Sequence, residues 1–469
     1  MWDFSRFGNK TALIDEYGTA ITYEQLEQEG EKISNVISKR CLVFSLCENS
    51  IGSILGYSSF LNHNIVPVLL SSHLEKELLE NLMSVYRPAY LWVPNGQVNE
   101  FKGSRMIYEG YGYALLQTDD HRNYPLYEDL CLMLTTSGST GSPKFVRQSY
   151  GNVKDNAKSI VEYLKLDESE RPITTLPMNY TYGLSIINSH FFVGATLLVT
   201  DKGLMQKEFW SFFKNQGATS FGGVPYTYEM LDRLRFWRME LPSLRTMTQA
   251  GGKLIPELHK KFAEYAKEAG KNFIVMYGQC EATARMGYLP PEKAIEKCGS
   301  MGIAIPGGEF HLVDINGKYI SEPFVTGELV YKGTNVTLGY AECGEDLRKA
   351  DERNGVLQTG DMAQFDEDGY FYIVGRKKRF LKIYGNRVNL DEIDRLVKGR
   401  FETIDCASAG VDDHMYLFVT DEALSDAVKE FVVFKTKLNA AAFQVVAVDE
   451  IPKNDSGKTL YKELEKYYR

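Results

Sequence analysis

Short apolar runs, rich in β-branched and aromatic residues, alternate with amphipathic stretches through the N-terminal part of the chain. Runs of this length and composition are typical of buried strands, and the stretches between them have the spacing of helices. Their alternation predicts an α/β fold, in which helices cover the faces of a sheet. The runs that carry the pattern are residues 41–46, 66–70, 89–93 and 195–199.

The chain is longer than one hydrophobic core usually supports. With 469 residues, 44% of them apolar, we expect two or more domains. Between Phe310 and Ile373 the pattern changes to hairpins, with turns at Asn316-Gly317 and Asp368-Gly369, which predicts a β-rich subdomain.

Beyond the hairpins the residues form a small α+β pattern. It consists of helices near residues 390–397 and 423–432, with strands near residues 407–411 and 416–419. We therefore expect a large N-terminal domain of α/β layers, residues 1–377, that includes the β-rich subdomain. A small C-terminal α+β domain, residues 378–469, should follow it.

The overall composition excludes several classes of protein. A net charge of −9 and a pI near 5.5 argue against a nucleic-acid-binding protein. The seven cysteines are odd in number and form no Cys-x-x-Cys pair, so neither a disulfide framework nor a structural zinc site is indicated. No signal peptide and no run of about 20 apolar residues is visible. We expect an unprocessed, soluble cytoplasmic protein that does not bind membranes.

A loop of hydroxyls, two glycines and a lysine, residues 135–144, directly follows the apolar run 130–134. Glycines let backbone N–H groups approach an anion, hydroxyls donate further hydrogen bonds, and a lysine supplies a compact positive charge. Composition alone leaves a phosphate-binding loop and a mobile surface loop equally supported. A Walker loop is excluded because Pro143 stands where its second glycine would be, and no Gly-x-Gly-x-x-Gly precedes a helix. Ser456-Gly457-Lys458-Thr459 forms a second lysine loop of another kind.

Further segments place these two loops in a larger, ordered pattern. In chain order the motifs are 136–144, Tyr277-Gly278-Gln279-Cys280-Glu281, Gly327-Glu328-Leu329 with Gly339-Tyr340, Thr359-Gly360-Asp361, Gly375-Arg376 and 452–458. With these motifs the chain resembles the adenylate-forming superfamily of acyl- and aryl-CoA synthetases, peptide-synthetase adenylation domains and beetle luciferases. The opening also fits, since Thr11–Asp15 followed by residues 21–26 is similar to the family's first hairpin and helix.

The resemblance implies roles in binding ATP and Mg²⁺. The loop and Lys144 would hold the phosphates, Glu281 would help to ligate Mg²⁺, Tyr277 would lie against the adenine, and Asp361 would accept hydrogen bonds from the ribose. Taken without the family, Glu281 and Asp361 would be ordinary surface and turn residues. The implied nucleotide-binding residues are Thr136, Ser137, Gly138, Ser139, Gly141, Lys144, Gly251, Gly252, Tyr277, Gly278, Gln279, Cys280, Asp361 and Arg376.

The resemblance also implies a catalytic group carried by a moving domain. Lys458 would bridge the carboxylate and α-phosphate oxygens in the first half-reaction, with Thr140 and Glu281 as the other catalytic residues. The small domain would then rotate about a hinge at Lys378, withdraw Lys458 and present residues 382–388 for attack by a thiol. No side-chain nucleophile on the enzyme is needed.

Three positions bear on rate and substrate. Cys280 stands where the family commonly has threonine, which implies weaker contact with Mg²⁺ or phosphate, and Tyr180 replaces a frequent histidine at the gate of the acyl pocket. Amino-acid-activating relatives resemble one another in carrying an aspartate where this chain has Thr181. Because an unpaired buried ammonium is costly, we expect an acid without an α-amino group. The predicted acid-binding residues are Tyr182, Gly222, Gly223 and Ala250.

The leading hypothesis is therefore an AMP-forming acid–thiol ligase. The thiol could belong to CoA or to the phosphopantetheine arm of a separate acyl carrier protein. A second hypothesis is an enzyme that adenylates an amino acid and loads a carrier protein, which Thr181 disfavours. A third is a catalytically silent nucleotide-binding scaffold; the retention of Lys144, Glu281, Asp361 and Lys458 argues against it.

Overall fold

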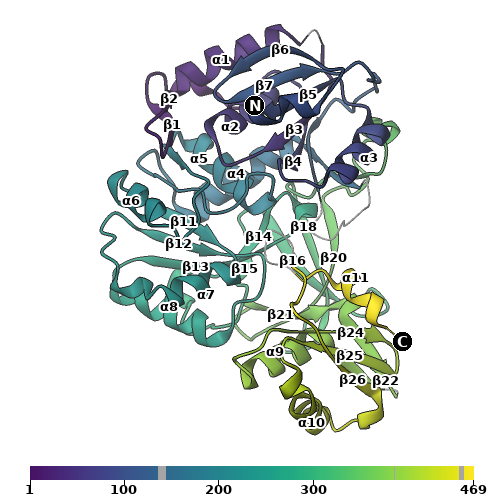
Figure 1. Cartoon of the computed structure of the whole chain (residues 1–469). Coiled ribbons are helices and arrows are strands. Elements are labelled where there is room, and N and C mark those ends of the chain that lie inside the picture. Colours follow the sequence, from purple (N-terminus) through teal and green to yellow (C-terminus); the bar gives the residue numbers. More distant parts are fainter. Residues whose placement is uncertain (38, 136–143, 385, 454–458, 469) are drawn as a thin grey trace. The chain divides into compact units, whose positions relative to one another are not determined.

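The computed structural model of the chain describes residues 1–37, 39–135, 144–384, 386–453 and 459–468. The chain forms two compact units (Figure 1). The first unit comprises Met1–Glu309 with Tyr331–Leu357, and the second comprises Phe310–Val330 with Gln358–Arg469. The hinge predicted at Lys378 falls inside the second unit and stays a prediction.

The first unit is built on an eight-stranded mixed sheet. Its strands, in spatial order, are β19 (Gly339–Ala341), β9 (Phe145–Ser149), β8 (Leu130–Thr135), β4 (Val66–Ser71), β3 (Leu42–Cys47), β5 (Tyr90–Pro94), β7 (Tyr113–Gln117) and β6 (Arg105–Gly110). The four central strands, β8 to β5, are parallel, and the outer strands pair antiparallel. β3 is buried along its whole length, which explains why five of its six residues are apolar.

Two further sheets complete the first unit. A five-stranded sheet has the order β11 (Ser220–Gly223), β12 (Thr246–Gln249), β13 (Asn272–Gly278), β14 (Arg285–Tyr288) and β15 (Ile303–Ala304). β11 to β13 are parallel, and β14 and β15 are antiparallel additions. A three-stranded sheet has the order β10 (Leu197–Val199), β1 (Thr11–Asp15) and β2 (Ala20–Thr22).

Eight helices cover these sheets in the described part of the first unit. Thr22 begins the first helix with a capping box, because its hydroxyl accepts from the Gln25 N–H while the Gln25 side chain accepts from the Thr22 N–H. α7 and α8 lie on one face of the five-stranded sheet in Figure 1. The helices are α1 (Tyr23–Asn35), α2 (Ile51–Asn62), α3 (Lys76–Tyr86), α4 (Tyr150–Leu164), α5 (Thr181–Val193), α6 (Lys207–Asn215), α7 (Pro225–Arg233) and α8 (Pro256–Glu268).

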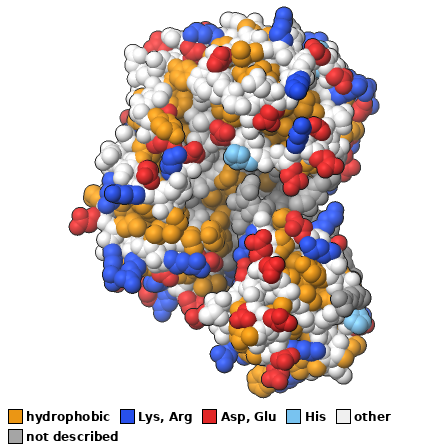
Figure 2. Space-filling model, viewed as in Figure 1, with side chains coloured by type: hydrophobic (Ala, Val, Ile, Leu, Met, Phe, Trp, Pro, Cys, Tyr) orange, Lys and Arg blue, Asp and Glu red, His pale blue; other side chains and the backbone are white. Residues whose placement is uncertain are grey.

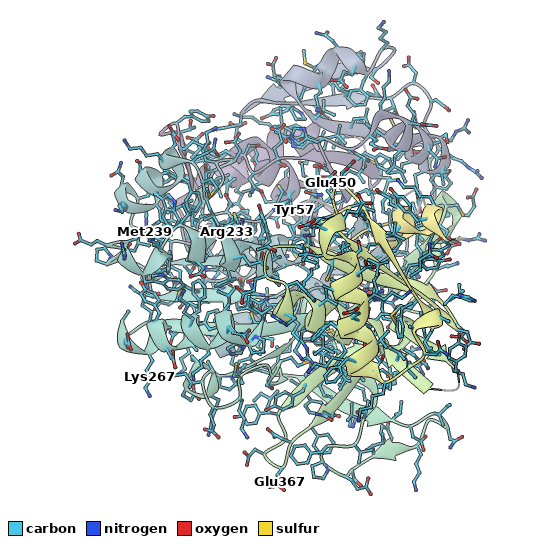
Figure 3. The ribbon with its side chains drawn as sticks, turned by 60° about the horizontal axis from the view of Figure 1, so that its bottom comes forward. Tyr57, Arg233, Met239, Lys267, Glu367 and Glu450 are labelled. Carbon is cyan, nitrogen blue, oxygen red and sulfur yellow. The ribbon has the colours of Figure 1, made fainter. Side chains whose placement is uncertain are left out.

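The main core of the first unit lies where α2 and α5 meet the sheets. Tyr57 of α2 is fully buried, and its hydroxyl donates to Asn188 Oδ1 of α5 at 2.7 Å. In Figure 3, Lys267, in the last turn of α8, points outward at the edge of the molecule. Nearly every face of α2 and α5 is buried, whereas α8 keeps one polar face toward solvent.

The second unit contains a five-stranded sheet, a hairpin and a three-stranded sheet. The first has the order β17 (Tyr319–Ile320), β16 (Gly308–Val313), β18 (Gly327–Gly333), β20 (Val356–Phe365) and β21 (Phe371–Arg376). A 3₁₀ turn, η7 (Lys377–Arg379), leads to the hairpin of β22 (Phe380–Ile383) and β23 (Asn386–Asn389). The last sheet joins β24 (Cys406–Val411), β25 (His414–Val419) and β26 (Phe443–Ala447).

Helices cover both faces of this last sheet. α9 (Leu390–Arg400) and α10 (Ser425–Thr436) enclose one apolar core with Met415, Leu417 and Phe443. The short α11 (Tyr461–Leu464) covers the other face, where Leu464 packs with Tyr416 and Phe418. Alternate residues of β25 thus point into the two cores, as the period of a strand requires.

The structure confirms the predicted α/β class and the predicted elements. The four apolar runs form β3, β4, β5 and β10, and the two predicted hairpins form β16–β17 and β20–β21. The C-terminal helices and strands also lie where the pattern placed them. Acidic and basic side chains are interspersed over the face shown in Figure 2.

None of the helices in the described residues combines the length and the apolar character needed to cross a membrane.

Candidate active site

Lys144 lies at the base of the predicted phosphate loop. Thr135 at the end of β8 pairs with Phe145 at the start of β9, so the two ends of the loop are held together. Nζ of Lys144 is 3.7 Å from the ring centroid of Tyr340 and 3.9 Å from Glu342 Oε1. The predicted loop residues Thr136, Ser137, Gly138, Ser139, Thr140 and Gly141 lie outside the described residues.

Glu281, the predicted metal ligand, meets the same tyrosine from the 3₁₀ turn η4 (Cys280–Ala282). Its carboxylate Oε1 accepts a hydrogen bond from the Tyr340 hydroxyl at 2.8 Å. Burial, together with the neighbouring carboxylate, raises the pKa of Tyr340, so the phenol stays a donor at neutral pH. Tyr340 therefore joins the predicted phosphate-binding cation to the predicted metal-binding carboxylate.

The backbone of Glu281 is fixed as firmly as its side chain. Its carbonyl oxygen accepts from Thr337 N at 3.0 Å, Thr337 Oγ1 at 2.9 Å and Arg353 Nη1 at 3.0 Å. The Arg353 guanidinium also lies over the Tyr340 ring, 4.6 Å from its centroid. Three donors on one carbonyl leave the η4 turn little freedom, and the carboxylate position follows from the turn.

The turn also depends on close backbone approach. A Cβ on Gly278 would lie 1.8 Å from the Ala284 carbonyl oxygen, so only glycine fits there. Thr283 has φ +65°, in the left-handed region, and its hydroxyl donates to Asn335 O at 2.7 Å. The Asn335 amide in turn donates to Ala282 O at 2.9 Å. These bonds compensate the strain of the positive φ at a β-branched residue.

Cys280 and Gln279 face different parts of this site. The Cys280 thiol lies 3.7 Å from the Thr135 carbonyl oxygen, at the start of the phosphate loop. A thiol is a weaker hydrogen-bond donor than the hydroxyl of the usual threonine, so the weaker contact with Mg²⁺ or phosphate stays a prediction. Gln279 Nε2 donates to the hydroxyl of Tyr277, the predicted adenine-binding residue, at 3.2 Å.

The predicted acid-binding residues gather in one apolar cluster. Tyr182 and Ala250 are buried there with Val224, Ile274 and Met276. The Tyr182 hydroxyl lies 2.7 Å from Thr248 Oγ1, and a Cβ on Gly222 would come within 2.9 Å of that hydroxyl. Gly222 and Gly223, at the end of β11, therefore let the Tyr182 ring and α7 approach the strand.

The glycine turn after β12 borders the same cluster. Gly251 has φ +83°, and a Cβ there would lie 2.6 Å from the Tyr180 hydroxyl. The Gln249 side-chain amide donates to the carbonyl oxygens of Ala250, at 3.2 Å, and Gly252, at 2.9 Å. Tyr180, which replaces the frequent histidine, is thus placed directly against the predicted nucleotide-binding turn.

Thr181 offers no negative charge that could pair with an ammonium group. It is buried, and its hydroxyl donates to the Thr283 carbonyl oxygen, which ties α5 to the η4 turn. A hydroxyl committed to a backbone carbonyl offers no negative charge to a substrate.

Asp361 and Arg376 come together in the second unit. They are paired across β20 and β21, with Arg376 Nε 3.6 Å from Asp361 Oδ1. Asp361 is buried and its backbone N–H donates to Thr359 Oγ1 at 3.1 Å, whereas Arg376 is largely exposed. The buried carboxylate and the exposed guanidinium suit the predicted contacts with ribose and phosphate.

The remaining predicted residues of the second unit are described only in part. Lys378 lies in η7, between the first sheet of the unit and the β22–β23 hairpin. Lys458 and Gly385 lie outside the described residues. Arg379, which directly follows Lys378 in the chain, is buried and pairs with Asp391 and Asp394, each at 2.8 Å.

Several residues that build the site had no predicted role. Tyr340 belongs to one of the predicted motifs, but only its contacts with Lys144 and Glu281 in the structure show its role. Asn335 and Arg353 belong to none of the predicted motifs. Buried Arg285 of β14, whose side chain contacts Tyr182, also gave no signal in the sequence. Their roles depend on partners distant in sequence.

Comparison with known proteins identifies the family of the chain. A family model described as AMP-binding enzyme matches residues 2–341. Among curated relatives, oxalate–CoA ligase of Arabidopsis thaliana is 31% identical over 350 residues, covering 72% of this chain and 66% of that protein. 2-Succinylbenzoate–CoA ligase of Bacillus pumilus is 26% identical over 455 residues, covering 93% and 91%. The match thus spans slightly less than two thirds of the Arabidopsis protein and most of the bacterial one.

Solved structures share the fold. O-succinylbenzoate coenzyme A synthetase from Bacillus subtilis, in complex with AMP, aligns with a TM-score of 0.80 at 21% identity, covering 99% of this chain and 98% of that one. ATP-bound MatB from Rhodopseudomonas palustris aligns with a TM-score of 0.79 at 20% identity, covering 99% and 98%. The α/β architecture is therefore that of these enzymes.

Proposed function

Since the chain belongs to the AMP-binding enzyme family, we propose that it activates a carboxylic acid with ATP and passes the acyl group to a thiol. In the first step a carboxylate oxygen bonds to the α-phosphorus and pyrophosphate leaves. In the second a thiol sulfur bonds to the acyl carbon and AMP leaves. The observation that carries the proposal is that Tyr340 contacts both Lys144, the predicted phosphate-binding cation, and Glu281, the predicted metal-binding carboxylate.

The residues fit a magnesium ion that is held partly by phosphate. Mg²⁺ prefers oxygen ligands and is commonly bound by one or two carboxylates together with substrate phosphates. The described residues hold no group of three or more His, Cys, Asp and Glu that would form a complete protein cage. Glu281 supplies one oxygen ligand from a rigid turn, and its Oε2 has no hydrogen-bonding partner among those residues. Bound there, Mg²⁺ would neutralise charge on the phosphates.

Each side chain then has a task in bringing two anions together. Lys144 would attract the departing phosphates at the base of the loop, and Asp361 would accept hydrogen bonds from the ribose. Lys458 would stabilise charge on the carboxylate and the α-phosphate in the transition state. The hinge at Lys378 would deliver and withdraw Lys458, in keeping with the family resemblance.

We propose an acid without an α-amino group. Thr181 offers no carboxylate to an ammonium, and its hydroxyl is already bonded to Thr283 O. The curated relatives reported above are named for the acids oxalate and 2-succinylbenzoate. They are also named as CoA ligases, which favours CoA over a carrier protein as the thiol.

The test is acid-dependent pyrophosphate release from ATP and Mg²⁺ across short, aromatic, hydroxy and amino acids, with hydroxylamine trapping the adenylate. We expect release with organic acids that Lys458→Ala abolishes. Adding CoA, or a carrier protein with its phosphopantetheine arm, should then distinguish the acceptor by which one forms a thioester. Release with amino acids alone would contradict the proposed substrate class, and ATP binding without release for any acid would favour the silent scaffold.

A further inference from the structure

A buried arginine lies against the apolar cluster without an acidic partner. Arg285 of β14 is 3% exposed. Its Nε donates to Ser185 Oγ at 3.0 Å, and its Nη1 donates to the Tyr163 hydroxyl at 3.1 Å and lies 3.4 Å from Met276 Sδ. Its guanidinium is 5.2 Å from the ring centroid of Tyr182. Arg285 forms no ion pair with any residue that the structure describes.

The groups around this guanidinium are neutral. Burial raises the pKa of Tyr182 to about 12, and it also raises the pKa of Tyr163, so neither phenol is ionised near neutral pH. The other contacts are a hydroxyl and a thioether. Contact with the Tyr182 ring stabilises the cation only in part. The positive charge of Arg285 is therefore not balanced by its surroundings.

The other buried arginines of the described chain are balanced. Arg147 is fully buried and pairs with Glu352 at 2.6 Å. Arg379 pairs with Asp391 and Asp394. A buried charge without a counter-ion destabilises a fold considerably, and these pairs avoid that cost. Arg285 differs from both, and an anionic ligand would remove the difference.

Arg285 lies beside the cluster that is predicted to bind the acid. Tyr182 and Met276 belong to the apolar cluster with Ala250, in the region predicted to hold the acid, and Tyr163 packs against that cluster. Arg285 also pairs with Gly278 across β13 and β14, so its backbone adjoins the turn that carries Glu281. The unbalanced cation thus faces the part of the unit where the non-reacting end of an acid would lie.

We propose that Arg285 binds a second carboxylate of the substrate, so that the preferred acid is a dicarboxylic acid. The inference rests on the proposed function and names its substrate class. No described residue accepts a hydrogen bond from Arg285 Nη2, which can therefore donate to a carboxylate, and the surrounding apolar side chains strengthen that interaction by excluding water. The same cation repels an ammonium, which again disfavours amino acids.

The experiment compares dicarboxylic acids with their monomethyl esters in acid-dependent exchange of pyrophosphate with ATP. Succinic, glutaric, adipic and isophthalic acids are suitable pairs, since each ester keeps the carbon skeleton and loses one charge. For the preferred skeleton we expect the wild-type kcat/KM to favour the diacid by about 100-fold or more. Arg285→Met should reduce that preference to a few-fold, chiefly through a higher KM for the diacid. Arg285→Lys, which keeps the charge, should retain part of it.

Controls separate this inference from the proposed function. Arg105→Met removes an exposed arginine of β6 and should leave the diacid preference unchanged. Equal wild-type activity with diacids and esters, or with simple monocarboxylic acids, would overturn the inference and leave the proposed function standing. A preference that survives Arg285→Met would also overturn it. Absence of exchange with every acid would refute both. The wild-type comparison needs no variant, so misfolding of Arg285→Met would not prevent a decision.

Discussion

Replacing Tyr340 with phenylalanine tests the arrangement around Glu281 most directly. The variant removes the hydroxyl that donates to Glu281 Oε1 at 2.8 Å and keeps the ring that Lys144 and Arg353 contact. A hydrogen bond to a charged group contributes about 1.5–3 kcal/mol. If that bond orients the carboxylate toward Mg²⁺, its loss should lower kcat/KM for ATP by about 10- to 100-fold, at about 1.4 kcal/mol for each factor of ten.

The assay is pyrophosphate release at several Mg²⁺ concentrations. For Tyr340→Phe we expect the Mg²⁺ concentration at half-maximal rate to rise, because the carboxylate is no longer held in place. Tyr23→Phe is a matched control: it removes a buried hydroxyl that donates to Ala195 O at 2.6 Å, so it should lower stability without changing the Mg²⁺ dependence. An unchanged Mg²⁺ dependence in Tyr340→Phe would refute the reasoning, and equal shifts in both variants would show a loss of folding instead.

Three further outcomes are expected. Gly278→Ala should lower the unfolding free energy by about 2–3 kcal/mol, because its Cβ would collide with a carbonyl oxygen; Gly399→Ala in α9, where nothing lies within 4 Å, should not destabilise in the same urea titration. Burial lowers the pKa of His190 to about 4, below its unfolded value of about 6.5, so the unfolded state binds more protons between these values. Neutral, buried His190 should therefore contribute about 3 kcal/mol to the free energy of unfolding above pH 6.5, and this contribution should be lost as the pH falls to 4. Urea unfolding of His190→Gln should show a correspondingly weaker pH dependence, and an equal slope would contradict this account. Asp361→Asn should raise the KM for ATP about 10-fold while Tm changes little, and an unchanged KM would argue against a ribose contact.

Sequence patterns were sufficient where the information is local. The apolar runs predicted β3, β4, β5 and β10, and Asn-Gly and Asp-Gly turns predicted two hairpins, because strand period and turn chemistry depend on neighbouring residues. The ordered motifs identified the family, which the match over residues 2–341 confirms. They did not predict that β19 pairs with β9 at the edge of the large sheet.

Long-range pairing decided what the site contains. Tyr340 lies opposite Val146 across β19 and β9, which brings its ring to Lys144 and its hydroxyl to Glu281. No local periodicity encodes this contact, because strand order within a sheet depends on how distant segments share one core. The motif indicated that Gly339-Tyr340 belongs to the family, and only the tertiary structure assigned the tyrosine a role.

The role of Arg285 could not be predicted from the sequence either. In the sequence it is one of many charged residues, and most charged residues of a protein are solvated. Its burial, and its lack of an ion pair with any described residue, became visible only when β14, α4 and α5 were assembled around its side chain. The sequence alone therefore determined the fold class and the family, and it predicted roles for the motif residues, since these depend on residue type and order. The tertiary structure decided which charges are paired, because pairing requires segments distant in the chain to meet.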